Sequence, residues 1–315
     1  MKGGESGAVD VSAVIVNWNA RDLLQACLES LRDHPPRDRS LEIVVVDNAS
    51  TDGSADLVRT GWPDVVLEVP PENEGYQRAN NRGVRLSRGK YLLLINSDAQ
   101  LRAGALDAMV DRLEADDRAA VVGPRLVYAD GSFQRWTAGH APDLAGVASF
   151  FLFGEKLSRA AAHRSIYLAE DVREPFRPDW VSSACMLVRR DALDEVGLMD
   201  ERYFYGMDDV DLCQRFRDAG WHVWYDPAAE VVHLMGDGRV TKKASPAGIR
   251  NFNDYFTRRH GPVAGAAARA MGCLGFGVRA AGYAGRSLVR PGGDDRAAGR
   301  DHLRNARVTL QRGHV

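Results

Sequence analysis

Residues 11–19 read VSAVIVNWN and residues 41–54 read LEIVVVDNASTDGS. Each stretch is a continuous apolar run that ends in polar residues, a pattern typical of a strand buried on both faces of a sheet. A helix is expected after each run, with Asn19 as the cap of the first and Ser54 near the start of the second. This repeat of strand, polar loop and helix predicts an α/β fold.

The same plan continues along the chain. Residues 90–98, KYLLLINSD, are expected to form a buried strand that ends in an acid, and residues 119–127 form another. Strands that alternate with helices predict a doubly wound, mostly parallel sheet. Ligands of such sheets bind beyond the carboxyl ends of the strands. Asn17, Asp47 and Asp98 all lie at such ends.

The second half of the chain is less regular. A hairpin turn is expected within residues 128–133. Residues 137–179 show little periodicity and are interpreted as a long functional loop, with short helices possible, that closes over a site. A helix with acids in its first turn is expected over 208–220, and two strands are expected over 221–227 and 229–234.

Composition excludes several classes of protein. The 315 residues include 41 lysines and arginines and 43 aspartates and glutamates, for a formal net charge of -2, so no overall field attracts nucleic acid. The four cysteines form no C-x-x-C pair and fit a reducing compartment. Because we find no signal peptide and no run of about 20 apolar residues, we expect a cytoplasmic protein.

One large domain with an appendage is expected. The predicted parts are a disordered tail over 1–10, a main domain over 11–260 with halves 11–130 and 131–260, an Ala/Gly-rich amphipathic helical extension over 261–295 and a disordered tail over 296–315. On a helical wheel the extension places Arg279, Arg286 and Arg290 together, with Arg269 at the edge of their arc. This basic face predicts that residues 262–290 contact the inner face of the plasma membrane; packing on the main domain is the alternative.

Two carboxylates at strand ends are the first candidates for chemistry. Asp47 can accept a hydrogen bond from a base or a ribose hydroxyl, as an acid after a second strand does in nucleotide sites. Capping of the next helix is the alternative. Asp98 follows an apolar strand, and such a carboxylate can hold Mg²⁺ or Mn²⁺ while a diphosphate supplies further oxygens. A surface or capping acid is the alternative there.

Other nucleotide-binding classes lack their motifs in this chain. A dinucleotide site needs G-x-G-x-x-G after the first strand, and the segment at that place is VNWNARD, without glycine. The P-loop pattern G-x-x-x-x-G-K-[ST] is absent as well. A sugar-1-phosphate nucleotidyltransferase also normally has a glycine-rich loop after its first strand, so it is kept only as an alternative.

Seven segments occur in the order expected of family 2 glycosyltransferases. They are VIVNWN, VVVDNASTDGS, NEGYQRANNRG, LLLINSD, SSACMLVRRDALDEVGLMDERYF, DDVDLCQRFRDAGW and EVVHLMG. Over residues 11–260 the chain resembles this family, and in particular its bacterial rhamnosyltransferase-like branch. The resemblance implies a GT-A fold, a nucleotide-diphosphate sugar donor, a divalent cation and transfer with inversion to a glycan or a polyprenyl-linked acceptor.

The resemblance also implies which residues form the donor site. Asp98 matches the last acid of the family's metal motif, although the fuller D-x-D pattern is missing, and His233 matches a histidine that completes the Mg²⁺ or Mn²⁺ site. A satisfied histidine at a strand end is the alternative for His233. The residues expected at the nucleotide sugar are Val16, Asn17, Trp18, Asp47, Asn48, Asn73, Gly75, Asn81, Ser97 and Asp98.

Three acids lie in the aromatic stretch YFYGMDDVDLC, residues 203–213. The family's general base falls on Asp209, which takes the proton of the acceptor hydroxyl. Asp208 stands where relatives usually carry Glu, and we expect it to contact the acceptor or support the base. Asp211 is expected to bind backbone N–H groups or to pair with Arg215. The alternative is that all three are ordinary first-turn helix acids.

The acceptor is expected beside the strand that begins near residue 180. By resemblance, Trp180 stacks on a sugar face, with core packing as the alternative, and Ser182 and Ser183 donate to hydroxyls. The favoured function is transfer of rhamnose or another deoxysugar from a dTDP- or UDP-sugar, in cell wall polysaccharide biosynthesis. A non-catalytic nucleotide- or glycan-binding module of the same fold is the competing hypothesis.

Overall fold

The computed structural model describes residues 9–152, 166–168, 170–235, 246–289 and 295–310. The chain divides into two compact units. The first comprises Met1–Ala138, Asp171–Phe204 and Asp208–Arg239, and the second comprises Gly139–Glu170, Tyr205–Met207 and Val240–Val315. Every residue that the sequence predicts for the site belongs to the first unit.

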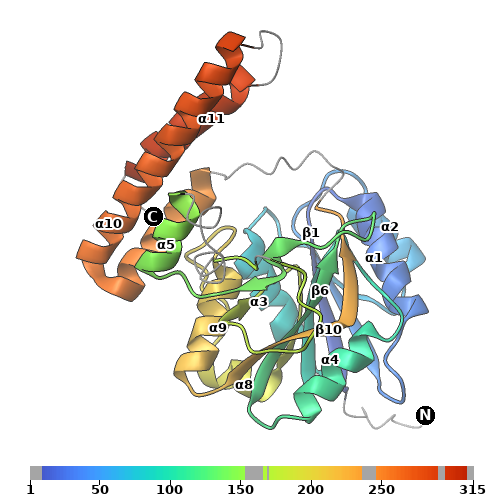
Figure 1. The fold of residues 1–315 in the computed structure, drawn as a ribbon. Helices are drawn as coiled ribbons and strands as arrows, with labels where there is room; N and C mark the ends of the chain where they lie inside the picture. The colour runs from blue at the N-terminus through green and yellow to red at the C-terminus, as the bar shows by residue number, and fades with distance from the viewer. Residues whose placement is uncertain (1–8, 153–165, 169, 236–245, 290–294, 311–315) are drawn as a thin grey trace, which may run out of the picture. The chain divides into compact units, whose positions relative to one another are not determined.

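An eight-stranded sheet in the order β3-β2-β1-β4-β9-β6-β10-β5 forms the first unit (Figure 1). The first four strands in this order run parallel, as do β6 and β10, whereas β9 runs antiparallel to β4 and β6, and β5 antiparallel to β10. The strands are β1 (Val11–Asn17), β2 (Leu41–Asp47), β3 (Val66–Glu68), β4 (Tyr91–Asn96), β5 (Ala99–Leu101), β6 (Ala119–Val127), β9 (Cys185–Arg189) and β10 (His222–His233).

The apolar runs near the start of the chain form the centre of this sheet. β1 pairs with β2 and β4 in a register that sets Asn17 beside Asp47 and Val16 beside Asn96. Asp98 follows two residues after β4 ends. Because parallel strands end at the same edge of a sheet, polar residues from three separate segments are brought together there.

Helices cover both faces of the sheet. The helices of this unit are α1 (Arg21–Asp33), α2 (Ser54–Gly61), α3 (Tyr76–Leu86), α4 (Ala105–Glu114), α8 (Arg190–Val196) and α9 (Asp208–Asp218). α1, α2 and α4 share a core with Ile15 and Val45, and Figure 1 shows α1 beside α2. α3 covers the opposite face, where a Cβ added to Gly83 would lie 2.4 Å from Cγ1 of Val14. The predicted doubly wound, mostly parallel α/β fold is confirmed.

β10 is a single strand where the sequence predicts two. The residues on either side of Pro227 are out of register with β6, because proline has no N–H to donate to the ladder and is accommodated in an irregular stretch. The end of β10 pairs with β5, so that His233 lies opposite Ala99. This pairing carries His233 to the neighbourhood of Asp98.

The turn predicted within residues 128–133 is confirmed, since the N–H of Tyr128 donates to the carbonyl of Ser132 at 2.8 Å. The segment over 137–179, predicted as a loop, contains regular structure in its described parts. These parts include α5 (Leu144–Phe151) and the short strand β7 (Ala138–Gly139), which pairs with β8 (Trp180–Val181) just after the segment; η1 (Arg135–Thr137) lies at its start. Residues 153–165 and 169 lie outside the described residues.

The second unit is built around two long helices, α10 (Pro246–Val289) and α11 (Asp295–Leu310). α11 corrects the predicted disordered tail over 296–315: Ala306 and Val308 are buried in a cluster with Phe276 of α10. Pairing with α10 supplies the apolar burial that the arginine-rich composition of this segment does not suggest. Residues 1–8 and 311–315 of the two predicted tails lie outside the described residues.

Two arginines of the predicted basic face of residues 262–290 make hydrogen bonds within the second unit. Arg279 donates to the carbonyls of Phe150 and Phe151 at the end of α5, and Arg269 donates to the hydroxyl of Thr257. Long arginine side chains reach such carbonyls readily, because those at a helix end lack intrahelical partners. Arg290 lies outside the described residues. In the described part of the chain, no helix combines the length and the hydropathy needed to span a bilayer.

Candidate active site

The ends of β1 and β2 are joined by their side chains. Asn17 Nδ2 donates to Asp47 Oδ1 at 3.0 Å and to Ser50 Oγ at 3.3 Å, and the Ser50 hydroxyl donates to Asp47. Asp47 does not cap α2, because Asp52 accepts from both the N–H and the hydroxyl of Ser54. The buried amide and carboxylate therefore form a polar corner between two strands.

Two acceptor atoms in this corner have no hydrogen-bond partner among the described residues, Asn17 Oδ1 and Asp47 Oδ2. An unpaired buried acceptor costs about 1–3 kcal/mol, and a base N–H or a ribose hydroxyl would supply the missing donor. The surrounding chain covers both atoms, so a ligand reaches them only after a neighbouring group moves. Val16 is half-buried in β1, and Trp18 is 58% exposed next to this corner.

The predicted cap of α1 is wrong. Asn19 adopts a left-handed backbone with φ +51°, and its Oδ1 accepts from the N–H of Thr51. Asp52 Oδ2 instead accepts from the first N–H of the helix, that of Arg21, at 2.9 Å. Asn19 thus joins the loop after β1 to the loop after β2, next to the contact between Asn17 and Asp47.

Asn48 holds the loop that leads into α3. Its Nδ2 donates to Asn73 Oδ1 at 2.9 Å and to the carbonyl of Gly75 at 3.2 Å, and its Oδ1 accepts from the N–H of Glu74. Gly75 has φ +85°, and a Cβ there would lie 2.7 Å from the carbonyl oxygen of Phe204. Only glycine fits this close approach, so Asn48, Asn73 and Gly75 together fix the start of α3.

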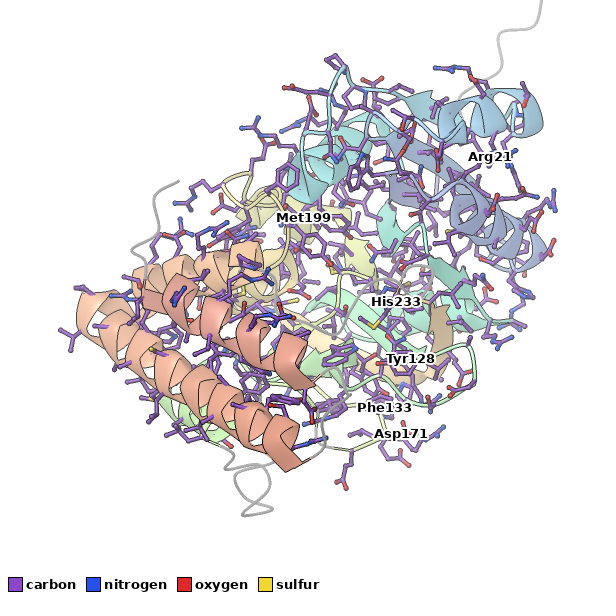
Figure 2. All side chains as sticks on the ribbon, turned by 90° about the horizontal axis from the view of Figure 1, so that it is seen from above. Arg21, Tyr128, Phe133, Asp171, Met199 and His233 are labelled. Carbon is purple, nitrogen blue, oxygen red and sulfur yellow. The ribbon has the colours of Figure 1, made fainter. Side chains whose placement is uncertain are left out.

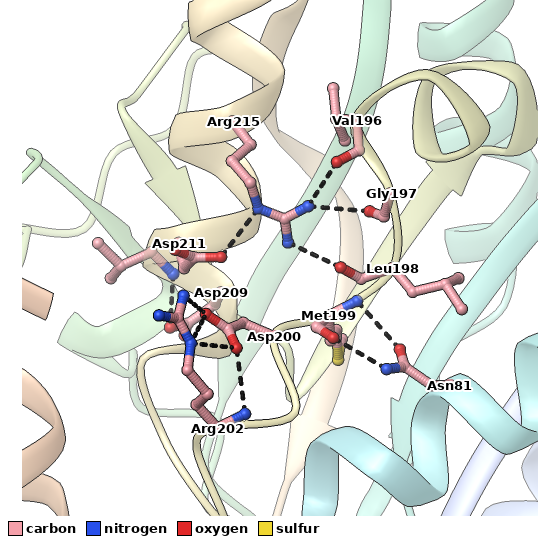
Figure 3. A network of polar contacts seen from close by, with 11 residues as sticks. Asn81, Val196, Gly197, Leu198, Met199, Asp200, Arg202, Asp209, Asp211 and Arg215 are labelled. Atoms are coloured by element: carbon pink, nitrogen blue, oxygen red, sulfur yellow. Dashed lines mark hydrogen bonds and ion pairs between the residues drawn. The ribbon is translucent and has the colours of Figure 1, made fainter. Parts of the chain in front are cut away.

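Asn81 and Arg215 hold the segment that precedes the three acids (Figure 3). Asn81 exchanges hydrogen bonds with the N–H and carbonyl of Met199. Arg215 pairs with Asp211 at 2.9 Å, as predicted for Asp211. Its other nitrogens donate to main-chain carbonyls, those of Val196, Gly197 and Leu198. The Asn81 amide also donates to Glu201 Oε1 at 3.0 Å, so both of its hydrogens are used within the protein.

Asp98 and His233 meet at the end of the sheet. His233 Nε2 lies 3.4 Å from Asp98 Oδ1, and both side chains are largely buried. The N–H of Leu234 donates to the carbonyl of Asp98 at 3.0 Å, and the other ring nitrogen of His233, Nδ1, lies 3.0 Å from Gln134 Oε1. Ser97, immediately before Asp98, is buried. Main chain and side chains therefore hold this pair in place.

The donor types of this pair fit a divalent cation. A carboxylate oxygen and an imidazole nitrogen are ligands that Mn²⁺ accepts, and carboxylates suit Mg²⁺. No group of three or more His, Cys, Asp or Glu side chains suited to a metal occurs among the described residues. Asp98 and His233 would thus be the ligands that the protein supplies, and diphosphate oxygens and water would occupy the other coordination positions.

Asp208 and Asp209 open α9 and are adjacent carboxyl groups in a buried setting. Burial, and then the neighbouring Asp208 charge, raise the pKa of Asp209 well above its ordinary value of 3.8. Bonds from the N–H groups of Val210, at 2.8 Å, and Ser183 oppose this rise in pKa. Gln77, fully buried on α3, donates to Asp208 Oδ1 at 3.2 Å.

The turn at residues 182–184 links the two acidic sites. The Tyr76 hydroxyl bonds to Asn96 Oδ1 at 2.8 Å and to the Ser183 carbonyl at 3.0 Å, and the N–H of Asn96 donates to the Ala184 carbonyl. Asn96 precedes Asp98 by two residues, while the N–H of Ser183 bonds to Asp209. Short chains of hydrogen bonds therefore connect the end of β4 with the start of α9.

The predicted acceptor residues lie on this same turn. Ser182 and Ser183 are half-buried, and Ser182 Oγ accepts from the N–H of Ala184. Trp180 is only 3% exposed, as the core alternative states, so a sugar would stack on its ring only after the surrounding chain moved. The two serines are the better placed of the three to meet a ligand.

Three polar side chains at the site escaped the sequence analysis: Tyr76, Gln77 and Gln134. Each acts through a contact with a residue far away in sequence, which no local pattern reveals. The only sequence signal is a run of polar residues in α3 at positions that a covered helix would give to apolar side chains, where Gln77, Asn80 and Asn81 are all buried.

The chain matches known proteins over most of its length. The family model for glycosyl transferase family 2 matches residues 12–197. N-acetylglucosaminyl-diphospho-decaprenol L-rhamnosyltransferase of Mycobacterium tuberculosis is 34% identical over 230 residues, which cover 69% of this chain and 74% of the relative.

Two solved structures share the fold. A mannosyltransferase from Pyrobaculum calidifontis, in complex with GDP-Man and Mn²⁺, superposes with a TM-score of 0.56 at 19% identity over 96% of this chain and 87% of that one. GalNAc-T7 with UDP, GalNAc and Mn²⁺ gives a TM-score of 0.58 at 16% identity over 82% of this chain and 52% of that one.

The family match agrees with the motifs from which the resemblance was drawn, and the solved structures agree with the predicted GT-A fold. Since the family model covers more than half of the chain, the assignment does not depend on any single motif. The protein is therefore an enzyme that transfers glycosyl groups, and it belongs to glycosyl transferase family 2.

Proposed function

We propose that this enzyme transfers rhamnose, or another deoxysugar, from a dTDP- or UDP-linked donor to a lipid-linked glycan acceptor, with inversion at the anomeric carbon. One observation carries the proposal: an acid–imidazole pair and a carboxyl group of raised pKa are joined through one turn at the same edge of the sheet. The mycobacterial rhamnosyltransferase, which by name acts on a decaprenol-linked sugar, supports the choice of sugar and acceptor.

On the donor side, the corner of Asn17 and Asp47 would bind the base or ribose through its two unpaired acceptors. Asp98 and His233 would hold Mg²⁺ or Mn²⁺ at the diphosphate. When bound, the cation neutralises the charge that develops on the departing diphosphate. Asn48, Asn73 and Gly75 fix the loop that leads into α3 and contribute no charge.

On the acceptor side, Asp209 would take the proton of the attacking hydroxyl at its carboxylate oxygen. Its raised pKa makes it a stronger base than an ordinary aspartate, and the N–H groups of Val210 and Ser183 hold its orientation. Asp208, held by Gln77, would support this base or contact the acceptor beside Ser182 and Ser183.

A donor and acceptor panel tests the proposal. Purified protein with Mg²⁺ or Mn²⁺ is given dTDP-rhamnose, UDP-rhamnose, UDP-glucose or GDP-mannose and a polyprenyl-diphosphate N-acetylglucosamine acceptor, and the product is examined by NMR. We expect rhamnosyl transfer with an inverted anomeric centre. Retained configuration contradicts the mechanism, and donor binding without turnover across the panel favours the binding module. Pyrophosphate release from a sugar 1-phosphate and a nucleoside triphosphate would indicate a nucleotidyltransferase.

We also propose that the second unit contacts an anionic membrane surface on the cytoplasmic side, where a lipid-linked acceptor would be met. In the described parts of α10 and α11 the acidic side chains are half-buried, and each pairs with an arginine: Asp254 with Arg258, Asp295 with Arg286 and Asp301 with Arg304. The exposed large aliphatic side chains of these helices are Val263, Leu274, Val278, Leu303 and Leu310, and their exposed arginines are Arg258, Arg259, Arg286, Arg300, Arg304 and Arg307. Aliphatic groups that insert beside positive charges are typical of helices lying on anionic lipid.

Vesicle flotation measures this contact. We expect the protein to float with phosphatidylglycerol vesicles and to release them in high salt, and L274E/V278E to lose most of the binding. V66E is the matched control, because Val66 is an exposed aliphatic residue on an edge strand of the first unit and not on these helices. This variant should float like wild type. Equal flotation of L274E/V278E and wild type contradicts the proposal, as does self-association through this face.

A further inference from the structure

Gln134 lies behind His233 and belongs to no predicted site. The turn after β6 returns the chain, so that Phe133 bridges Val127, and the N–H of Gln134 donates to the carbonyl of Leu126 at 3.0 Å. Figure 2 labels Tyr128 and Phe133 on the two sides of this turn, together with His233. The Gln134 side chain is fully buried at the joined ends of β6 and β10.

The surroundings fix which way the Gln134 amide points. One end of the amide lies 2.5 Å from the carbonyl oxygen of His233 and 3.3 Å from that of Val127. Only an NH₂ group can donate to two carbonyls, so Nε2 occupies this end. The amide oxygen Oε1 therefore faces the imidazole, 3.0 Å from Nδ1.

This arrangement determines the proton position on the ring. An amide oxygen only accepts, so Nδ1 must carry the hydrogen, and the neutral ring then has its lone pair on Nε2. That lone pair faces Asp98 Oδ1 across 3.4 Å. Two electron-rich atoms at this separation attract a positive charge placed between them and repel each other without it.

We propose that Gln134 is a positioning residue that keeps His233 in the Nδ1–H tautomer and so presents Nε2 as a cation ligand beside Asp98. An imidazole that binds metal through one nitrogen commonly donates its other N–H to an oxygen acceptor, which sets tautomer and ring direction. Here the acceptor is the uncharged amide of Gln134. Its NH₂ group donates to two carbonyls, and this fixes the orientation of the amide. This inference rests on the proposed cation site, and its test separates the two.

The test is ¹⁵N NMR of histidine-labelled, metal-free protein at a pH of about 9, where free imidazole is neutral. His233 is assigned by the loss of its signal in H233Q. We expect the Nδ1–H tautomer in wild type and in Q134E, which keeps an oxygen facing Nδ1, and a mixture of tautomers in Q134M. An Nε2–H tautomer in wild type, or an unchanged preference in Q134M, overturns the proposal. If Q134E does not fold, wild type and Q134M decide alone.

Mn²⁺ titration of the same proteins by calorimetry gives a second readout. Outer partners of metal-bound histidines typically affect metal affinity about 10- to 100-fold, so we expect Q134M to bind Mn²⁺ that much more weakly and Q134E to restore binding. Equal Mn²⁺ affinity of Q134M and wild type contradicts the role assigned to Gln134. If wild type shows the Nδ1–H tautomer but binds no Mn²⁺, the proposed cation site fails while the tautomer assignment stands.

Discussion

The two acidic sites at the edge of the sheet are built in opposite ways. Asp98 Oδ1 faces Nε2 of His233 at 3.4 Å, so a carboxylate oxygen meets an imidazole nitrogen. Asp209 adjoins a second carboxyl, Asp208, in a buried setting that raises its pKa. The first arrangement suits a cation and the second suits a proton. The proposed inverting transfer would use the first site for the donor and the second for deprotonation of the acceptor.

The largest expected effect comes from Asp209→Asn. If Asp209 is the base, kcat falls by about 10²–10⁴-fold, while donor and Mn²⁺ binding stay unchanged, because those belong to the other site. Turnover and donor affinity, measured side by side, check this. A folded variant that retains full activity removes Asp209 as the base.

The same variant has a stability signature. The folded protein holds the proton on Asp209 more tightly than the unfolded chain does, so the stability linked to this group is lost as pH rises above 3.8 and through the raised pKa. Asp209→Asn removes that loss. We expect its Tm to exceed that of wild type at a pH of about 8 and the difference to narrow as the pH falls toward 3.8. A Tm below that of wild type at high pH contradicts the raised pKa.

A smaller effect is expected from Asp208→Asn, which removes the like charge beside Asp209. The pKa of Asp209 should fall, so the base ionises at lower pH and the acid limb of kcat/KM shifts downward. A pH profile of kcat/KM from both proteins measures the shift. Gln77 can still pair with an amide at this position, so folding is preserved. If the acid limb does not move, or moves to higher pH, the charge of Asp208 does not raise the pKa of the base.

The smallest effect is expected from Arg215→Lys. Lysine keeps a charge for Asp211 but cannot reach three carbonyls with one planar group. We expect a stability loss of about 1–3 kcal/mol and a modest fall in kcat, with Mn²⁺ affinity unchanged. Urea unfolding and metal titration provide these numbers. A large change in Mn²⁺ affinity would mean that the two sites are not independent.

The first half of the chain is predictable because its signals are local. The apolar runs before Asn17, Asp47 and Asn96 identify buried parallel strands, and the parallel pairing brings their ends together without further information. The strand-end acids were therefore predicted with their correct place in the sheet. Their contacts were not, since Asn17 bonding to Asp47 depends on register and side-chain rotation.

The second half of the chain is less predictable because its contacts join distant segments. The irregular pairing around Pro227 and the burial of α11 on α10 depend on partners that no window of sequence contains. Gln134 shows this most clearly. It follows an ordinary turn, and its importance comes from lying behind His233, 99 residues away along the chain.

Electron spin-echo spectroscopy of Mn²⁺ bound to ¹⁵N-histidine-labelled protein, with the nucleoside diphosphate present, tests the cation site most directly. Coupling to a single histidine nitrogen is expected in wild type and in Asp209→Asn, and its disappearance in His233→Gln. Coupling that persists without His233, or Mn²⁺-dependent turnover with no nitrogen coupling at all, would show that the metal binds elsewhere.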